Sequence, residues 1–225
     1  MSGKGGDGPK GGATGAAGGD EGLARPDPGG DEKLLDKRLA AIRDALDADL
    51  GRALPPVHDW HPARTADVDI RIASDGRWYY GGTSIERARM VRLFSTVLRV
   101  DDEADGSSST YLVTPQERLR ITVDDAPFTA VALEVHGTPE AQALVFTTNV
   151  GDRVVADADH PIEVEYAHPD ADPRPYVLVR DRLRALISRA VFLELAELAE
   201  ERDEALGVVS RGAFMPLSAE TTLGP

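Results

Sequence analysis

The sequence contains no cysteine, few aromatic residues and no long apolar run. Without cysteine, disulfides and thiolate-based metal or nucleophile chemistry are excluded. No stretch approaches the roughly 18 apolar residues of a membrane-spanning helix. The first ten residues, MSGKGGDGPK, lack the apolar segment of a signal peptide. We therefore expect a soluble cytoplasmic protein.

Positive charge is also scarce, because 25 basic residues stand against 39 acidic ones and the formal net charge is -14. Such a field repels phosphate backbones and anionic lipid, so we expect neither nucleic acid nor a membrane as partner. An acidic excess is typical of a well-solvated surface. It still permits a local arginine pocket that binds one small anion.

Sequence patterns of known catalytic centres are missing as well. Nucleophile-elbow, metalloprotease and dinucleotide-binding patterns do not occur, and the glycine-rich start lacks the context of a phosphate loop. His58 and His61 are three residues apart, a spacing that suits a metal on a helix, but the flanking prolines favour extended backbone. We expect no catalytic residue, no metal and no cofactor.

Composition divides the chain into four parts. Residues 1–31 are rich in glycine and too poor in apolar residues to fold, which predicts a disordered tail. Residues 32–107 are expected to hold an N-terminal helix over 32–50 and a first lobe. Residues 108–217 are expected to form a second lobe, mostly strands and ending in a long helix, and 218–225 a second tail.

Local patterns predict the elements of both lobes. Asp-Gly at 75–76 indicates a tight hairpin. Thr83 and Glu86 fit a capping box that opens a helix ending near Leu98, and Asp181 fits the cap of the last helix. The segment after that helix, GVVSRGAFMPLSAETTLGP, is expected to be irregular. Strands are predicted at 69–72, 77–80, 110–114, 118–123, 129–135, 143–150, 152–156, 161–166 and 176–179.

Two segments suggest an internal duplication. WYYGGTSIERARMVRLFSTVL and YVLVRDRLRALISRAVFLEL each read as an aromatic strand that leads into an arginine-rich amphipathic helix. Together with the strand pattern they predict an α+β fold of two similar lobes, each an antiparallel sheet with packed helices.

The hairpin DIRIASDGRWYYGG is the first candidate site. Asp69 and Arg71 point to the same face of a strand, and Trp78 or Tyr80 can lie opposite them. A carboxylate, a guanidinium and a flat ring could grip a planar polar ligand. The same groups could form an internal salt bridge covered by aromatic rings. The pattern leaves both interpretations open.

The second lobe offers a comparable group of residues. Asn149 lies at a turn in FTTNVGD, where its amide could serve either the turn or a ligand. Arg174 and Tyr176 flank Pro175, and arginine suits bidentate recognition of a carboxylate or phosphate. Arginine is equally the common partner of surplus acidic residues.

Several blocks together resemble the bacterial family called domain of unknown function 1285. They are PPVHDWHP, DIRIASDGRWYYGGTSIER, MVRLFSTVLR, YLVTPQERLRITVDDAPF, FTTNVGD, DHPIEV, PRPYVLVRDRLRALISRAVFLELAELA and GAFMPL. The resemblance covers about residues 55–217, although Gly81 and Ser84 depart from the acidic residue and proline expected there. It implies a two-lobed α+β protein with a duplicated core and a pleckstrin-homology-like second lobe. It also implies an interlobe cleft for a nucleotide-like ligand and a role in signalling.

We therefore expect a regulatory, non-enzymatic signalling module that binds a small, planar, anionic ligand between its lobes. One alternative is a protein–protein interaction module with a packed seam and a protein partner, and another is a metal-dependent hydrolase. The expected ligand-binding residues are Trp60, Asp69, Arg71, Trp78, Tyr80, Arg120, Asn149, Arg174 and Tyr176.

Overall fold

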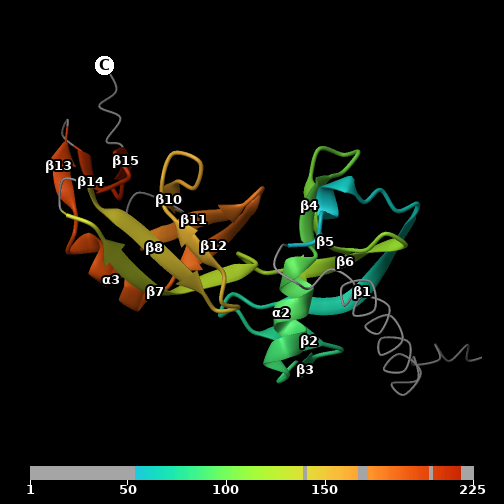
Figure 1. Cartoon of the computed structure of the whole chain (residues 1–225). Helices are drawn as coiled ribbons and strands as arrows, with labels where there is room; N and C mark the ends of the chain where they lie inside the picture. Colours follow the sequence, from blue (N-terminus) through green and yellow to red (C-terminus); the bar gives the residue numbers. More distant parts are fainter. Residues whose placement is uncertain (1–53, 139–140, 167–171, 203–204, 219–225) are drawn as a thin grey trace, which may run out of the picture. The chain divides into compact units, whose positions relative to one another are not determined.

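The computed structural model describes residues 54–138, 141–166, 172–202 and 205–218 (Figure 1). Within these ranges the chain forms two six-stranded sheets, a three-stranded sheet and two α-helices. The predicted N-terminal tail and the predicted helix over 32–50 lie outside the described residues, as do residues 219–225.

The first sheet has the strand order β3-β2-β1-β6-β5-β4. Its neighbouring strands run antiparallel, except that β1 and β6 are parallel. A short 3-10 helix, η1 (Val57–Asp59), precedes the sheet. The elements are β1 (Arg64–Ile72), β2 (Trp78–Tyr80), β3 (Thr83–Ser84), α2 (Ala88–Thr96), β4 (Leu98–Asp102), β5 (Ser108–Val113) and β6 (Glu117–Val123).

The second sheet repeats this plan in the order β10-β11-β12-β7-β8-β9, with β12 and β7 parallel. Each sheet thus joins two three-stranded meanders through its first and last strands. The helices differ in place, because α2 lies between the two meanders and α3 follows the second. The elements are β7 (Phe128–His136), β8 (Ala143–Thr148), β9 (Arg153–Val155), β10 (Ile162–Glu165), β11 (Arg174–Arg180), β12 (Leu183–Ile187) and α3 (Arg189–Ala196).

The expectation of two similar sheet lobes is confirmed at this level, and two details of it change. Strands β5 and β6 belong to the first sheet, because β6 pairs with both β5 and β1. The first lobe therefore extends to Val123 and does not end at residue 107. The sheets are also not wholly antiparallel, since each has one parallel pair at its centre. A pleckstrin-homology-like second lobe stays a prediction.

Both helices begin later than the sequence predicts. Thr83 pairs with Tyr80 in the small β2–β3 ladder and caps nothing, and α2 begins after Arg87. At the second helix, residues 183–187 form β12, in which every second side chain is buried. Asp181 lies in the turn before β12 with a φ of 50°, and Ser188 caps α3. Pairing with β11 and β7 outweighs the helical spacing of these leucines.

The C-terminal segment is not irregular over its described residues, 207–218. It holds most of β14 (Ala205–Ser210) and all of β15 (Ala213–Pro216), and β13 (Glu200–Arg202), which precedes it, completes the three-stranded sheet. Arg211 and Gly212 turn between β14 and β15 with φ values of 49° and 81°. Two successive left-handed residues match the right-handed twist of a tight hairpin.

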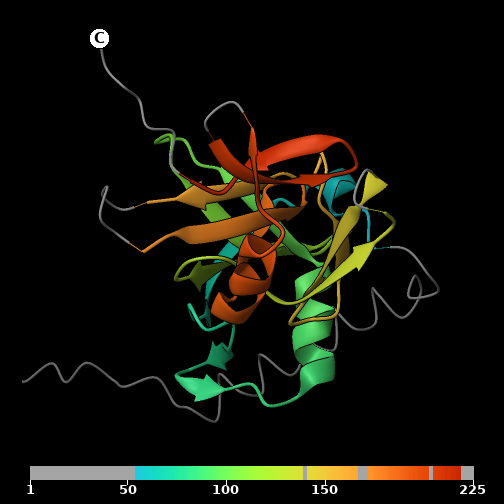
Figure 2. The same cartoon turned by 90° about the vertical axis from the view of Figure 1, so that its left-hand side faces the viewer.

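The cores are built from alternating strand residues and one face of each helix. In the first lobe the rings of Trp78 and Phe94 stack with centroids 6.0 Å apart, which fixes α2 on β2. In the second lobe α3, drawn in orange in Figure 2, contacts β7 and buries Val191 and Leu195. The β1–β2 turn and the β8–β9 turn are thereby held on rigid sheets.

A substitution at Gly76, in the β1–β2 turn, tests how closely the two lobes approach each other. It has a φ of +80°, and a Cβ there would lie 2.7 Å from Thr129 Oγ1 and 2.9 Å from Asn149 Nδ2. We expect Gly76→Ala to lower the free energy of unfolding by about 1–2 kcal/mol for the backbone and by roughly 1–3 kcal/mol more for crowding.

The matched control is Gly106→Ala. Gly106 has a φ of +83°, but a Cβ there would have nothing within 4 Å, so only the backbone cost applies. Urea unfolding of both variants gives the comparison. Equal losses in the two variants would show that the lobes do not press on this turn.

Candidate functional site

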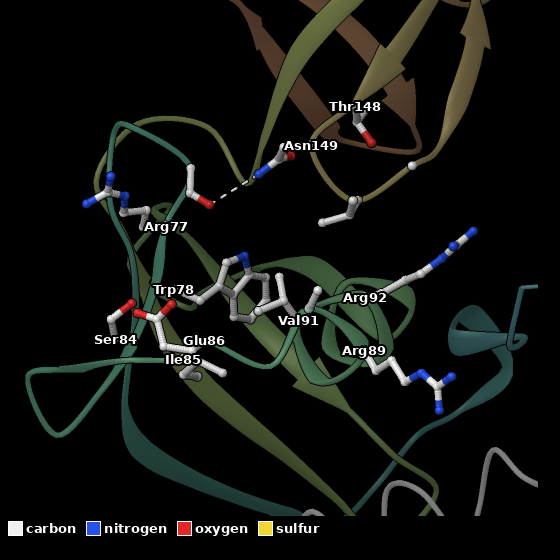
Figure 3. A pocket seen from close by; sticks show the side chains of 14 residues that line it. Arg77, Trp78, Ser84, Ile85, Glu86, Arg89, Val91, Arg92, Thr148 and Asn149 are labelled. Carbon is white, nitrogen blue, oxygen red and sulfur yellow. Dashed lines mark hydrogen bonds between the residues drawn. The ribbon is translucent and has the colours of Figure 1, made fainter.

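A cavity of about 830 Å³ lies where the first lobe faces the β8–β9 turn (Figure 3). Three segments line it: the β1–β2 turn with the start of β2, the run from β3 into α2, and the turn after β8. Its wall consists of Gly76, Arg77, Trp78, Ser84, Ile85, Glu86, Ala88, Arg89, Val91, Arg92, Thr148, Asn149, Val150 and Gly151. The volume suits a small molecule of metabolite size.

Trp78 forms part of the floor of this cavity. Its side chain is only 2% exposed, and it rests on Phe94. Its Nε1 is buried and has no hydrogen-bond partner among the described residues. Buried donors are nearly always paired, so an unpaired one beside a cavity marks a place where an acceptor atom is favoured.

Asn149 connects the two lobes across the cavity. Its Nδ2 donates to the carbonyl of Gly76 at 3.2 Å, the contact dashed in Figure 3. Its Oδ1 accepts from the Thr129 amide at 3.1 Å, which ties the side chain to its own sheet. Asn149 therefore serves the turn and the interlobe seam at the same time.

Arg180 makes a second contact between the lobes, and it binds the β8–β9 turn, which also carries Asn149. Its Nη1 donates to Asp152 Oδ2 at 2.7 Å, and its Nη2 donates to the Ser95 carbonyl near the end of α2 at 2.5 Å. The guanidinium also lies over the ring of Phe128, with Cζ 5.0 Å from the centroid. One side chain thus fixes both α2 and the β8–β9 turn, which both contribute residues to the cavity wall.

The charge of the wall is opposite to that of the chain. The wall contains Arg77, Arg89 and Arg92 and one carboxylate, Glu86, which gives it a formal charge of +2. Arg77 is also paired with Asp75, outside the wall, with Nε 3.5 Å from Oδ2. Within the described part of the chain, no ion pair or hydrogen bond occupies the guanidinium of Arg89 or of Arg92. The Arg92 guanidinium lies against the β8–β9 turn, since a Cβ on Gly151 would sit 3.7 Å from its Cζ.

The predicted hairpin cluster does not assemble as expected. Arg71 pairs across the sheet with Tyr79, whereas Trp78 lies opposite Ile72 and Tyr80 opposite Ile70. Adjacent residues point to opposite faces of a strand, so Asp69 and Arg71 lie on the face away from Trp78. The structure therefore brings Trp78 into the cavity without Asp69, Arg71 or Tyr80.

Arg71 is bound to an acidic residue outside the cavity. It forms an ion pair with Asp124, with Nε 2.8 Å from Oδ1. The hydrogen bond to Asp124 raises the pKa of Arg71, and the same bond lowers the pKa of Asp124. The alternative left open by the sequence, a salt bridge within the hairpin, would join Arg71 to Asp69; the structure instead pairs Arg71 with Asp124, outside the hairpin.

Arg120, Arg174 and Tyr176 also lie outside the cavity wall. The Arg120 Nε donates to the Tyr111 hydroxyl at 3.2 Å, and this bond raises the pKa of Arg120. Hydrogen bonds to Tyr176 and Asp125 raise the pKa of Arg174 in the same way. Tyr176 is buried, and burial raises the pKa of its hydroxyl.

Trp60 has a structural contact of its own. Its carbonyl accepts from Arg99 Nη1 at 2.8 Å, which fastens the segment after η1 to β4. Of the predicted site residues, Trp78 and Asn149 line the cavity. The arginines that line it were not among them. Their signal in the sequence is the spacing of Arg89 and Arg92, three apart on the polar face of an amphipathic helix.

Two further features concern metals and membranes. No group of three or more His, Asp or Glu side chains gathers as a metal site in the ranges that the structure describes. His58 instead pairs with Asp181, with Nε2 3.0 Å from Oδ2. No helix in the described part of the chain is long and apolar enough to cross a membrane.

Fold and cavity together define a protein of two similar sheet lobes with a cavity at their seam. Residues 55–126 match the N-terminal domain model of DUF1285, a domain of unknown function, and residues 127–217 match its C-terminal domain model. The chain therefore belongs to the DUF1285 family. The junction at residues 126 and 127 coincides with the passage from the first sheet to the second.

Two crystal structures of DUF1285 family proteins are similar to this chain. The one from Silicibacter pomeroyi DSS-3 is 44% identical with a TM-score of 0.72, and the alignment covers 82% of this chain and 96% of that one. The one from Shewanella baltica OS155 is 26% identical with a TM-score of 0.44, and covers 57% and 90%. None of the curated proteins gives a significant match.

Removing Arg180 tests the contact behind the cavity. Arg180→Ala leaves Asp152 and the Ser95 carbonyl without their half-buried partner, so we expect a loss of about 2 kcal/mol in the free energy of unfolding. Arg182→Ala is the matched control on the same hairpin, because Arg182 and Asp102 are both mostly exposed. We expect little change there. Urea unfolding measures both, and an equal effect of the two changes would contradict the role given to Arg180.

Proposed function

We propose that this protein is a cytoplasmic regulatory module that binds a small anionic, nucleotide-like ligand in the cavity between its lobes. The observation that supports it is the positive wall in a chain of net charge -14. In an acidic protein most arginines form ion pairs with carboxylates. Arg89 and Arg92 have no such partner among the described residues and line a hollow of suitable size.

The start of α2 adds to the attraction for an anion. Ala88 and Arg89, the first residues of this helix, line the cavity, and no side chain caps it. No acidic residue lies in its first turn. The first amides of a helix lack internal partners and carry the positive end of the helix dipole. Together with two guanidinium groups they favour a phosphate or a carboxylate.

The remaining wall favours an organic ligand over a bare ion. Val91 and Ile85 are half-buried, and Val150 and the Trp78 ring are buried, so part of the wall is apolar. A ligand with an anionic group and a flat apolar body would satisfy both parts. The face of Trp78 that rests on Phe94 is already occupied, so the indole supplies its edge to a ligand and does not sandwich it.

The test is binding of phosphate-bearing compounds measured by calorimetry and thermal shift. The panel contains orthophosphate, adenosine 5′-monophosphate and uridine 5′-monophosphate at millimolar concentration. A ligand that binds only the folded state raises the melting temperature by mass action. We expect the nucleotides to bind more tightly than orthophosphate and to weaken as salt is added.

Variants assign the binding to the cavity. Arg89→Ala combined with Arg92→Ala should weaken binding about tenfold or more, because hydrogen bonds to charged groups are involved. Arg189→Ala is the matched control, since Arg189 is an exposed arginine at the start of α3 and outside the cavity. No stabilisation by any of these anions, or an equal loss in the control, would refute the proposal.

A further inference from the structure

The geometry points to Trp78 as the residue that determines which anion binds. We propose that its indole N–H donates a hydrogen bond to a neutral acceptor in the flat part of the ligand, a ring nitrogen or a ring carbonyl. The expected ligand is thus a phosphorylated heterocycle and not merely a small anion. This inference rests on the proposed function and adds the chemical class of the ligand.

The unpaired donor is the first reason. Trp78 is 2% exposed, and its Nε1 has no partner among the described residues. An indole nitrogen can only donate a hydrogen bond. It therefore needs an acceptor, and neither a ring rotation nor a change of tautomer would let it bond to a neighbouring donor. Leaving such a group unpaired in the interior changes an equilibrium constant by about tenfold, and a ligand acceptor would recover that factor.

The position of the donor is the second reason. In Figure 3 the nitrogen edge of the Trp78 ring faces the second-lobe turn that carries Asn149 and Thr148. Arg89 and Arg92 extend on one side of the ring, whereas Arg77 extends on the other. A ligand that contacts both Arg89 and Arg92 as well as the indole edge therefore needs two separate chemical groups, an anionic group and a neutral hydrogen-bond acceptor.

Access to Nε1 requires a small movement of the wall. This atom is buried and its edge of the ring faces the β8–β9 turn in Figure 3, so we expect that turn to shift before an acceptor reaches it. The cavity-side tie of that turn is the 3.2 Å bond from Asn149 to Gly76. A neutral hydrogen bond near the surface contributes about fivefold to an equilibrium, so the opening is easily compensated by the new bond to the ligand.

The experiment compares two compounds of the same size, benzyl phosphate and pyridin-3-ylmethyl phosphate. They differ by one ring nitrogen, which is a neutral hydrogen-bond acceptor. We expect the pyridine compound to bind about tenfold more tightly in calorimetry. Nitrogen-15 spectra of the whole chain provide the local readout, because the chain has 2 tryptophans and hence two indole N–H signals.

Trp60 supplies the internal reference, since it lies outside the cavity wall. Trp60→Phe assigns the signals by removing one of them. The pyridine compound should move the Trp78 indole signal and leave that of Trp60 in place, whereas benzyl phosphate should move only backbone amides around the cavity. Trp78→Phe, if its melting curve shows a folded protein, should erase the tenfold difference.

The outcomes separate the two proposals. Equal affinity for both compounds, with the Trp78 indole signal unmoved, would overturn the role of Trp78 and leave anion binding intact. A Trp78 indole proton that exchanges with a bound water in the complex would overturn it too. If neither compound, nor any nucleotide, perturbs amides of the cavity wall, the proposed function itself fails.

Discussion

The contact on which the candidate site depends is the guanidinium of Arg180. It reaches the end of α2 and the β8–β9 turn at once, through the Ser95 carbonyl and Asp152. These elements belong to different lobes, and both contribute residues to the cavity wall. The other polar contact across the cavity, the Asn149–Gly76 bond, is longer and made by an exposed side chain.

The distribution of arginine explains why a positive cavity can exist in an acidic protein. Several arginines form ion pairs with carboxylates away from the cavity, as Arg71 does with Asp124 and Arg174 with Asp125. Such partly exposed pairs contribute little to stability, but they neutralise surplus acid locally. The first turn of α2 carries no acidic residue, which leaves Arg89 and Arg92 available on the cavity side.

The topology shared by the two sheets determines which turns meet at the seam between the lobes. In each lobe the first and last strands meet as a parallel pair at the centre of the sheet, so the hairpin turns fall at the ends of neighbouring strands. The β1–β2 turn of one lobe and the β8–β9 turn of the other meet at Gly76, whose missing Cβ permits the close approach to Thr129 and Asn149. Two turns and the first half of α2 therefore supply most of the wall, and turns offer the amides and polar side chains that ligands use.

Some local sequence patterns were enough to predict a turn, a strand or a helix. The Asp-Gly turn at 75–76, the alternating residues of β6 and the amphipathic face of α2 all correspond to observed elements. Local patterns were not enough where the spacing of apolar residues fitted both a helix and a strand. Leu183 and Ile187 fit a helix and a strand equally, and pairing with β11 and β7 decided for the strand.

The sequence by itself determined the short-range features: which residues turn, which alternate into a core, and that family-specific blocks fill both lobes. Only the tertiary structure decided which polar groups share a cavity. Strand register sets that choice, because a shift of one residue moves a side chain to the other face. Arg71 and Trp78 are close in sequence yet lie on opposite faces, whereas Trp78 and Asn149 meet only because two sheets bring their turns together.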